Sequence, residues 1–234
     1  MRILCLDTSG GSAVALVDTP AEGVTTVLRQ AAGTDPRRHA ESLAPLMTQV
    51  LGESREAVDA VAVGTGPAPF TGLRAGLVTA QAFARGRGID VHGVCSLDVL
   101  ARQALDVLGD DGEVLVATDA RRKEVYWARY RSLGADDVER LAGPEVTTAE
   151  AAAAANDLGG ATAPVVVGAG AALYPAHLSA GKGMPAAPDP AVLARLVRAR
   201  LARRAAGDDV ELGTEPRYLR RPDVQLPAAP KRAS

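Results

Sequence analysis

Residues 2–18 read RILCLDTSGGSAVALVD, two apolar runs joined by a short turn rich in Gly and Ser. This pattern predicts two strands, Ile3–Leu6 and Ala13–Val17. A similar pattern begins near the chain midpoint, where EVLVATDARR (residues 113–122) is an apolar strand that ends in an Asp and a turn, and EVYWARYRS (124–132) follows as a second strand. The parallel between LCLDTS and VATDAR, although short, predicts two related lobes that face a cleft.

Strands and helices alternate along the rest of the chain, which predicts the α/β class. Further strands are expected at TTVLRQA, DAVAVGTG, residues 91–95 and PVVVGAGA, and helices at residues 38–51, 72–84, from 96 onward, 147–155 and 190–206. We expect an N-terminal lobe of residues 1–108 and a C-terminal lobe of residues 109–234, with the last helix and the tail packing back across the lobes.

Composition limits the function classes. The chain has 234 residues, 47% of them hydrophobic, so it can bury a large core. Its two cysteines, Cys5 and Cys95, each lie inside an apolar run, which is typical of a reducing compartment. A net charge of −2 excludes a global nucleic-acid-binding field. Without a signal-like or membrane-spanning apolar run, we expect a soluble cytoplasmic protein.

Asp7, Thr8 and Ser9 follow the first strand, where an α/β sheet usually presents ligand-binding groups. The carboxylate could hold a metal-bound water near phosphates, and the hydroxyls and turn amides could bind phosphate oxygens. The same residues could equally form an Asx or Ser/Thr turn with no ligand. Asp119 is the matching candidate in the second lobe.

A glycine-containing loop follows the DAVAVGTG strand. A Walker loop needs Lys and then Ser or Thr at the helix start, but Leu73 and Arg74 stand there. Pro67 and Pro69 also remove two amide donors. The pattern therefore favours a structural turn that positions the next helix, punctuated by Gly64, Gly66, Gly72 and Gly76.

His39 begins a helix but has Leu43 four residues later, so the sequence lacks a His-x-x-x-His metal pair there. We expect His39 to be an interface or packing residue. The last long helix and the tail are rich in arginine, which could contact phosphates but favours a solvated helix face. These residues are Arg195, Arg198, Arg200, Arg203, Arg204, Arg217, Arg220 and Arg221.

Five segments in this order and spacing resemble the TsaB family, also called YeaZ. They are ILCLDTSGGSAVAL, RRHAESLAPLM, GTGPAPFTGLRAG, TDARRKEVYWARY and EPRYLRRPDV, and they span nearly the whole chain. One departure is GPAPFTG at residues 66–72, where family loops commonly read GPGSFTG. The departure weakens a nucleotide-binding role for this loop.

The resemblance implies the actin-like ATPase and sugar-kinase fold, and a role in making threonylcarbamoyladenosine beside the tRNA anticodon. It implies a non-catalytic dimerisation subunit that supports a catalytic paralogue, TsaD, with the small ATPase TsaE as a further partner and tRNA reached indirectly. The chain alone could form a homodimer. It would need no cofactor of its own, and ATP or ADP and a metal would enter the complex through its partners.

The resemblance also implies that the first two long helices pair with the paralogue. Their apolar stripes would supply the contact, although a stripe of this kind can equally form a plain core. The predicted interface residues are His39, Leu43, Leu46, Met47, Val50, Leu73, Leu77 and Ala80. Asp7, Thr8, Ser9 and Asp119 would be a vestigial nucleotide site.

An alternative function is an independent nucleotide-dependent small-molecule kinase of the same fold. Against it, the second lobe has no evident glycine-rich phosphate loop after VATDARRKE. A metallopeptidase is disfavoured by the missing ligand pair at His39 and Leu43.

Overall fold

The computed structural model describes residues 1–20, 24–33, 39–52, 57–109, 112–160 and 162–220. The first sheet has the strand order β3-β2-β1-β4-β5. The central strands β1 and β4 are buried over almost their whole length, which explains their uninterrupted apolar sequences. The strands are β1 (Arg2–Asp7), β2 (Ala13–Asp18), β3 (Thr26–Ala32), β4 (Ala60–Gly64) and β5 (Asp90–Val94).

The second sheet has the order β8-β7-β6-β9 and repeats part of the first. Strand β1 pairs antiparallel with β2 and parallel with β4, and β6 pairs antiparallel with β7 and parallel with β9. The short repeat seen in the sequence therefore corresponds to two related sheets. The strands are β6 (Glu113–Asp119), β7 (Glu124–Leu133), β8 (Asp137–Thr148) and β9 (Val165–Val167).

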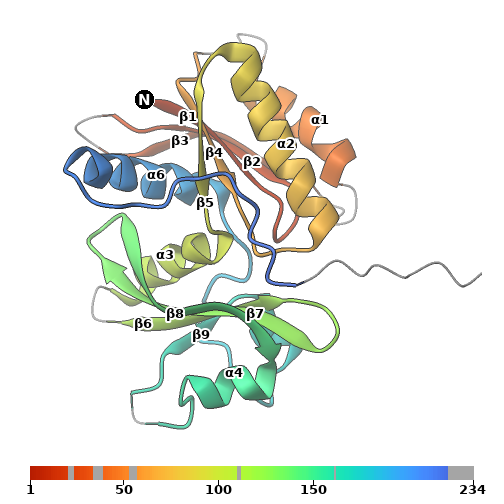
Figure 1. Cartoon of the computed structure of the whole chain (residues 1–234), viewed down its shortest axis with the longest axis vertical. Helices are drawn as coiled ribbons and strands as arrows, with labels where there is room; N and C mark the ends of the chain where they lie inside the picture. Colours follow the sequence, from red (N-terminus) through yellow and green to blue (C-terminus); the bar gives the residue numbers. More distant parts are fainter. Residues whose placement is uncertain (21–23, 34–38, 53–56, 110–111, 161, 221–234) are drawn as a thin grey trace, which may run out of the picture.

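Helices form layers on and between the sheets (Figure 1). Helices α1 (His39–Leu51) and α2 (Phe70–Arg87) cover the outer face of the first sheet. The short helices α4 (Ala149–Ala155) and α5 (Ala169–Leu173) cover the outer face of the second. Between the two sheets lie α3 (Ser96–Leu108) and α6 (Pro190–Ala205).

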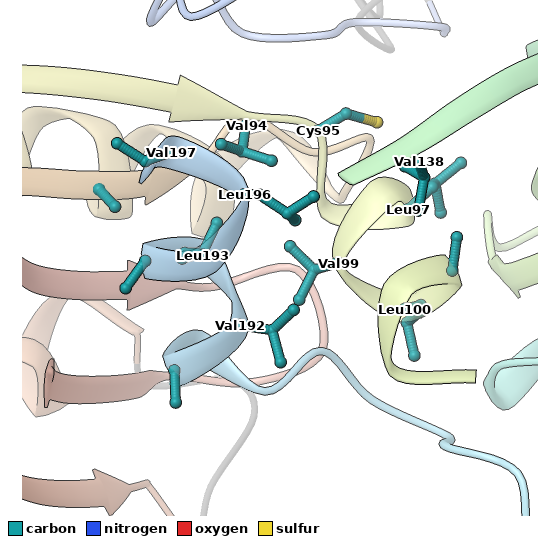
Figure 2. Packing of buried hydrophobic residues seen from close by; sticks show 14 of the residues in the cluster. Val94, Cys95, Leu97, Val99, Leu100, Val138, Val192, Leu193, Leu196 and Val197 are labelled. Atoms are coloured by element: carbon teal, nitrogen blue, oxygen red, sulfur yellow. The ribbon is translucent and has the colours of Figure 1, made fainter. Parts of the chain in front are cut away.

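Each half of the chain supplies the middle helix that packs on the sheet of the other half. Helix α6 packs on β1 and β2, whereas α3 packs on β6 and β7. Val192, Leu193 and Leu196 of α6 converge with Leu97 and Val99 of α3 in one buried cluster (Figure 2). A division at residue 108 thus does not separate two independent cores, because each sheet buries its inner face against a helix from the other half.

The tail after α6 runs in an extended conformation across both lobes. The amide of Gly93 donates to the carbonyl of Leu212 (2.9 Å), and the amide of Arg217 to that of Thr65 (2.9 Å). Farther on, the Arg220 guanidinium donates to the carbonyl of Ala120 in the second lobe (2.8 Å). The described tail therefore links the lobes.

Two elements differ from the sequence expectation: β8 and α5 were not predicted, and the other expected elements are present within a few residues of their predicted bounds. Strand β8 contains Gly143 and Pro144, which normally argue against a strand, and it accommodates them with register shifts opposite β7. Among the described helices, none combines the length and apolar character needed to cross a membrane.

Candidate functional site

A cleft of about 410 Å³ lies between the lobes, where β1 and β6 end. A volume of this size is within the usual range of small-molecule sites, about 300–1,000 Å³. Three of the four predicted site residues line it, Thr8 and Ser9 from the first lobe and Asp119 from the second. The other lining residues are Gly10, Gly11, Pro67, Pro69, Thr71, Gly72, Thr118, Arg121, Ala169, Ala186 and Pro188.

The fourth predicted residue, Asp7, lies beneath the cleft and is only 2% exposed. Its Oδ1 accepts hydrogen bonds from the amide (2.7 Å) and hydroxyl (2.6 Å) of Ser9. Its Oδ2 accepts one from the hydroxyl of Ser96 at the start of α3 (2.8 Å). Both carboxylate oxygens are thus engaged within the protein, which is the geometry of the Asx-turn alternative.

Glycines make room for this arrangement. A Cβ at Gly64 would overlap the Asp7 carboxylate, and a Cβ at Gly76 would come within 2.6 Å of the Thr8 hydroxyl. The Thr8 hydroxyl donates instead to the carbonyl of Gly72 (3.0 Å). The loop and the start of α2 are therefore fastened to the end of β1, in agreement with the predicted structural turn.

Asp119 is partly exposed, with 33% of its side chain accessible. Its Oδ1 accepts a hydrogen bond from the amide of Arg121 (2.7 Å), and its Oδ2 lies 3.6 Å from the Arg121 guanidinium. The Asp119 carboxylate therefore faces the cleft with a cation beside it.

The predicted interface stripe lies in the core of the first lobe. Seven of its side chains are 8% exposed or less, because they pack against the outer face of the sheet. These are Leu43, Leu46, Met47, Val50, Leu73, Leu77 and Ala80. A partner could not reach them without unfolding the lobe, which corrects their assignment as contact residues. The side chain of His39 lies outside the described residues.

The arginines of α6 match neither predicted alternative, because most of them pair with acids across the lobe boundary. Arg195 donates to Asp106 (2.6 Å) and Asp136 (2.8 Å). Arg200 and Arg203 both pair with Asp137. Their charges are therefore balanced by acids of the same chain, with Arg200 buried and Arg195 and Arg203 partly exposed. Arg221 lies outside the described residues.

Asp98 of α3 is the centre of this network, which the sequence analysis missed. It is 2% exposed and accepts hydrogen bonds from Tyr130 (2.8 Å), Arg140 (2.7 Å) and Arg200 (2.8 Å). Burial raises the pKa of the Asp98 carboxyl, but Arg200 and Arg140 lower it more strongly, to about 2. Its position on a helix face otherwise rich in apolar residues is the signal that could have found it.

The described residues hold no cluster of three or more His, Cys, Asp or Glu side chains placed to bind a metal. Both thiols are buried, and burial raises the pKa of Cys95 to about 12. These cysteines are packing residues of the inter-sheet core.

Comparison with known proteins was consistent across sequence and structure. The family model described as TsaD, tRNA N6-adenosine threonylcarbamoyltransferase, matches residues 25–169. An uncharacterised protein of Mycobacterium tuberculosis is 38% identical over 226 residues, 92% of this chain and 94% of that protein. The tRNA threonylcarbamoyladenosine biosynthesis protein TsaB of Escherichia coli is 39% identical over 99 residues, 41% of this chain and 42% of that protein. The solved structure of YeaZ from Pseudomonas aeruginosa has a TM-score of 0.72 and 28% identity, covering 93% of this chain and 99% of that one.

Two related lobes around a cleft, with mixed sheets flanked by helices, define a protein of the actin-like ATPase and sugar-kinase fold. Similarity over nearly the whole chain narrows this class further. The chain belongs to the TsaB/YeaZ family.

Proposed function

We propose that the chain is a non-catalytic dimerisation subunit in the biosynthesis of threonylcarbamoyladenosine beside the tRNA anticodon. Relatives from Escherichia coli and Haemophilus influenzae carry the name TsaB and that biosynthetic role. In this proposal its partners are a TsaD-like catalytic paralogue and a TsaE-like ATPase. Nucleotide and metal enter the complex through these partners.

The engagement of Asp7 is the observation that carries the non-catalytic part of the proposal. A carboxylate that serves a metal-bound water needs an oxygen directed at the cleft. Here Ser9 and Ser96 occupy both oxygens at 2.6–2.8 Å, and the side chain is 2% exposed. The same contacts disfavour an independent small-molecule kinase, although Thr8, Ser9 and Asp119 still line a ligand-sized cleft.

The outward faces of α1 and α2 are the surface proposed for the catalytic paralogue. On α1, Ala44, Pro45, Thr48 and Gln49 are exposed, and on α2, Arg74, Val78, Gln81, Ala82 and Arg85. Val78, which is 63% exposed, is the large aliphatic side chain among them. A specific interface buries about 800 Å² per partner, with a few central side chains dominating the affinity.

A charge at Val78 tests this surface. Val78→Arg should leave the monomer folded and abolish co-purification with the paralogue, because the new cation would be desolvated without a partner. Val107→Arg is the matched control, since Val107 is also 63% exposed but lies at the end of α3. Leu46→Arg would not serve, because Leu46 is 8% exposed and the change would unfold the lobe. Equal binding by both variants would place the interface elsewhere.

A further inference from the structure

The turn between β6 and β7 carries three consecutive cations in a costly conformation. Arg121, Arg122 and Lys123 have φ angles of 64°, 53° and 64°, in the left-handed region that favours glycine. The amide of Ala120 donates to the carbonyl of Glu124, and the amide of Glu124 to that of Arg121, both at 3.0 Å. Non-glycine residues held in this region concentrate at functional sites.

A pocket of about 170 Å³ lies beside this turn. It adjoins the inter-lobe cleft, and the two share Pro69 and Arg121 in their linings. It is smaller than sites for whole small molecules, about 300 Å³ and more, and suits a single planar group. Its described lining contains three arginines, three aromatic rings and no carboxylate. The residues are Ala68, Pro69, Phe70, Ala120, Arg121, Arg122, Tyr126, Tyr218, Leu219 and Arg220.

The aromatic side of the pocket is held rigidly. The rings of Phe70 and Tyr218 lie 4.6 Å apart between centroids. The Arg74 guanidinium lies 3.5 Å above the Phe70 ring, and its Nε donates to the Tyr218 hydroxyl (2.7 Å). Tyr218 nevertheless remains 38% exposed. A fixed ring with an accessible surface is a stacking platform of the kind that binds unpaired bases.

Two acids that flank the turn have cationic partners. Asp119 lies beside Arg121, and Glu124 pairs with Arg220. Since the three cations of the turn and Arg220 outnumber these two acids, the turn is a local basic feature of a chain whose net charge is −2. Cations bind phosphate oxygens and an aromatic ring stacks on a base, so a site with both can bind a nucleotide.

We propose that this pocket takes an unpaired nucleotide of an RNA strand, with the base stacked on Tyr218 and the adjoining phosphates at the Arg121–Lys123 turn. The choice of RNA over a free nucleotide rests on the proposed function. In this proposal the chain contacts RNA directly, and the contact is made by this turn and Tyr218.

The test uses the purified full chain alone and a fluorescein-labelled single-stranded RNA of about eight nucleotides, within the usual site size of such proteins. Fluorescence anisotropy gives the dissociation constant. Tyr218→Ala should weaken binding by about fivefold or more, the loss expected for one stacked base, and Tyr218→Phe should keep it. Arg122→Ala should weaken binding and reduce the slope of log K against log salt by about 0.7.

Arg87→Ala is the charge-matched control, because Arg87 lies over Phe83 at the far end of α2 and should leave binding unchanged. Absence of RNA binding, or unchanged binding by Tyr218→Ala, would overturn the proposal. Equal competition by uridine monophosphate or by polyglutamate would also overturn it, in favour of a free nucleotide or of charge alone. Since no partner is present, the result is independent of whether the complex modifies tRNA.

Discussion

Asp98 and Arg200 form a buried ion pair of 2.8 Å that joins α3 to α6 between the two sheets. Arg140 of β8 binds the other oxygen of the same carboxylate at 2.7 Å. One side chain thereby links both middle helices to the second sheet. This contact thus acts together with the apolar core between the sheets to hold the two lobes to each other.

Replacing Asp98 by Asn should therefore destabilise the whole protein. Arg140 would lose its carboxylate partner and Arg200 one of its two, Asp137 being the other, and breaking a buried pair typically costs about 3–5 kcal/mol. Urea unfolding followed by circular dichroism measures the change. The control is Arg131→Ala, which removes a pair with Glu139 in which both side chains are largely exposed, 55% and 42%, and should cost less than about 1 kcal/mol. Similar losses for the two variants would contradict the central role of Asp98.

The depressed pKa of Asp98 predicts a pH dependence of stability. Its folded-state pKa of about 2 lies below the ordinary value of 3.8. The stabilisation is therefore fully present above about pH 4 and is lost as pH falls toward 2, to a total of about 2 kcal/mol. The stability gap between wild type and Asp98→Asn should narrow by about 1 kcal/mol between pH 6 and pH 3. A gap that stays constant over this range would show that Asp98 titrates normally.

Two glycine substitutions test the packing beneath the cleft. Gly64→Ala should cost about 1–3 kcal/mol or more, because its Cβ would overlap the Asp7 carboxylate. Gly86 is an exposed position of helix α2 with no atom near the added Cβ, so Gly86→Ala should stabilise the protein by about 0.5–1 kcal/mol. Thermal unfolding of both variants gives the comparison. A neutral Gly64→Ala would contradict the close contact between the β4 backbone at Gly64 and the Asp7 carboxylate.

Periodicity and turn chemistry in the sequence were sufficient to predict most elements, including α6, whose start is fixed by the Asp189 cap on the Ala191 amide (2.9 Å). Local patterns could not reveal which sheet a helix covers, so the packing of α3 on the second sheet was not predicted, although the last helix was expected to pack back across the lobes. They also could not distinguish a buried stripe from a binding stripe. Leu46 and Val78 are both apolar helix residues, and only packing shows that Leu46 is 8% exposed and Val78 63%.

The cleft residues were predictable from local patterns, but their long-range partners were not. Strand ends placed Thr8, Ser9 and Asp119 together, since the two lobes repeat one strand arrangement. The partner of Asp7, Ser96, is 89 residues away in sequence and became evident only in three dimensions. The aromatic contact of Phe70 with Tyr218 joins segments that are far apart in the sequence, so no local pattern could reveal it.

The most direct test of the proposed function is reconstitution of tRNA modification from purified components. The TsaD-like paralogue, the TsaE-like ATPase, the threonylcarbamoyl donor and unmodified tRNA are combined with and without this chain, and threonylcarbamoyladenosine is measured by mass spectrometry of digested tRNA. Modification should require the chain, persist with Asp7→Asn because both Asp7 oxygens already bind Ser9 and Ser96, and fail with Val78→Arg. Equal modification in the absence of the chain would contradict the account.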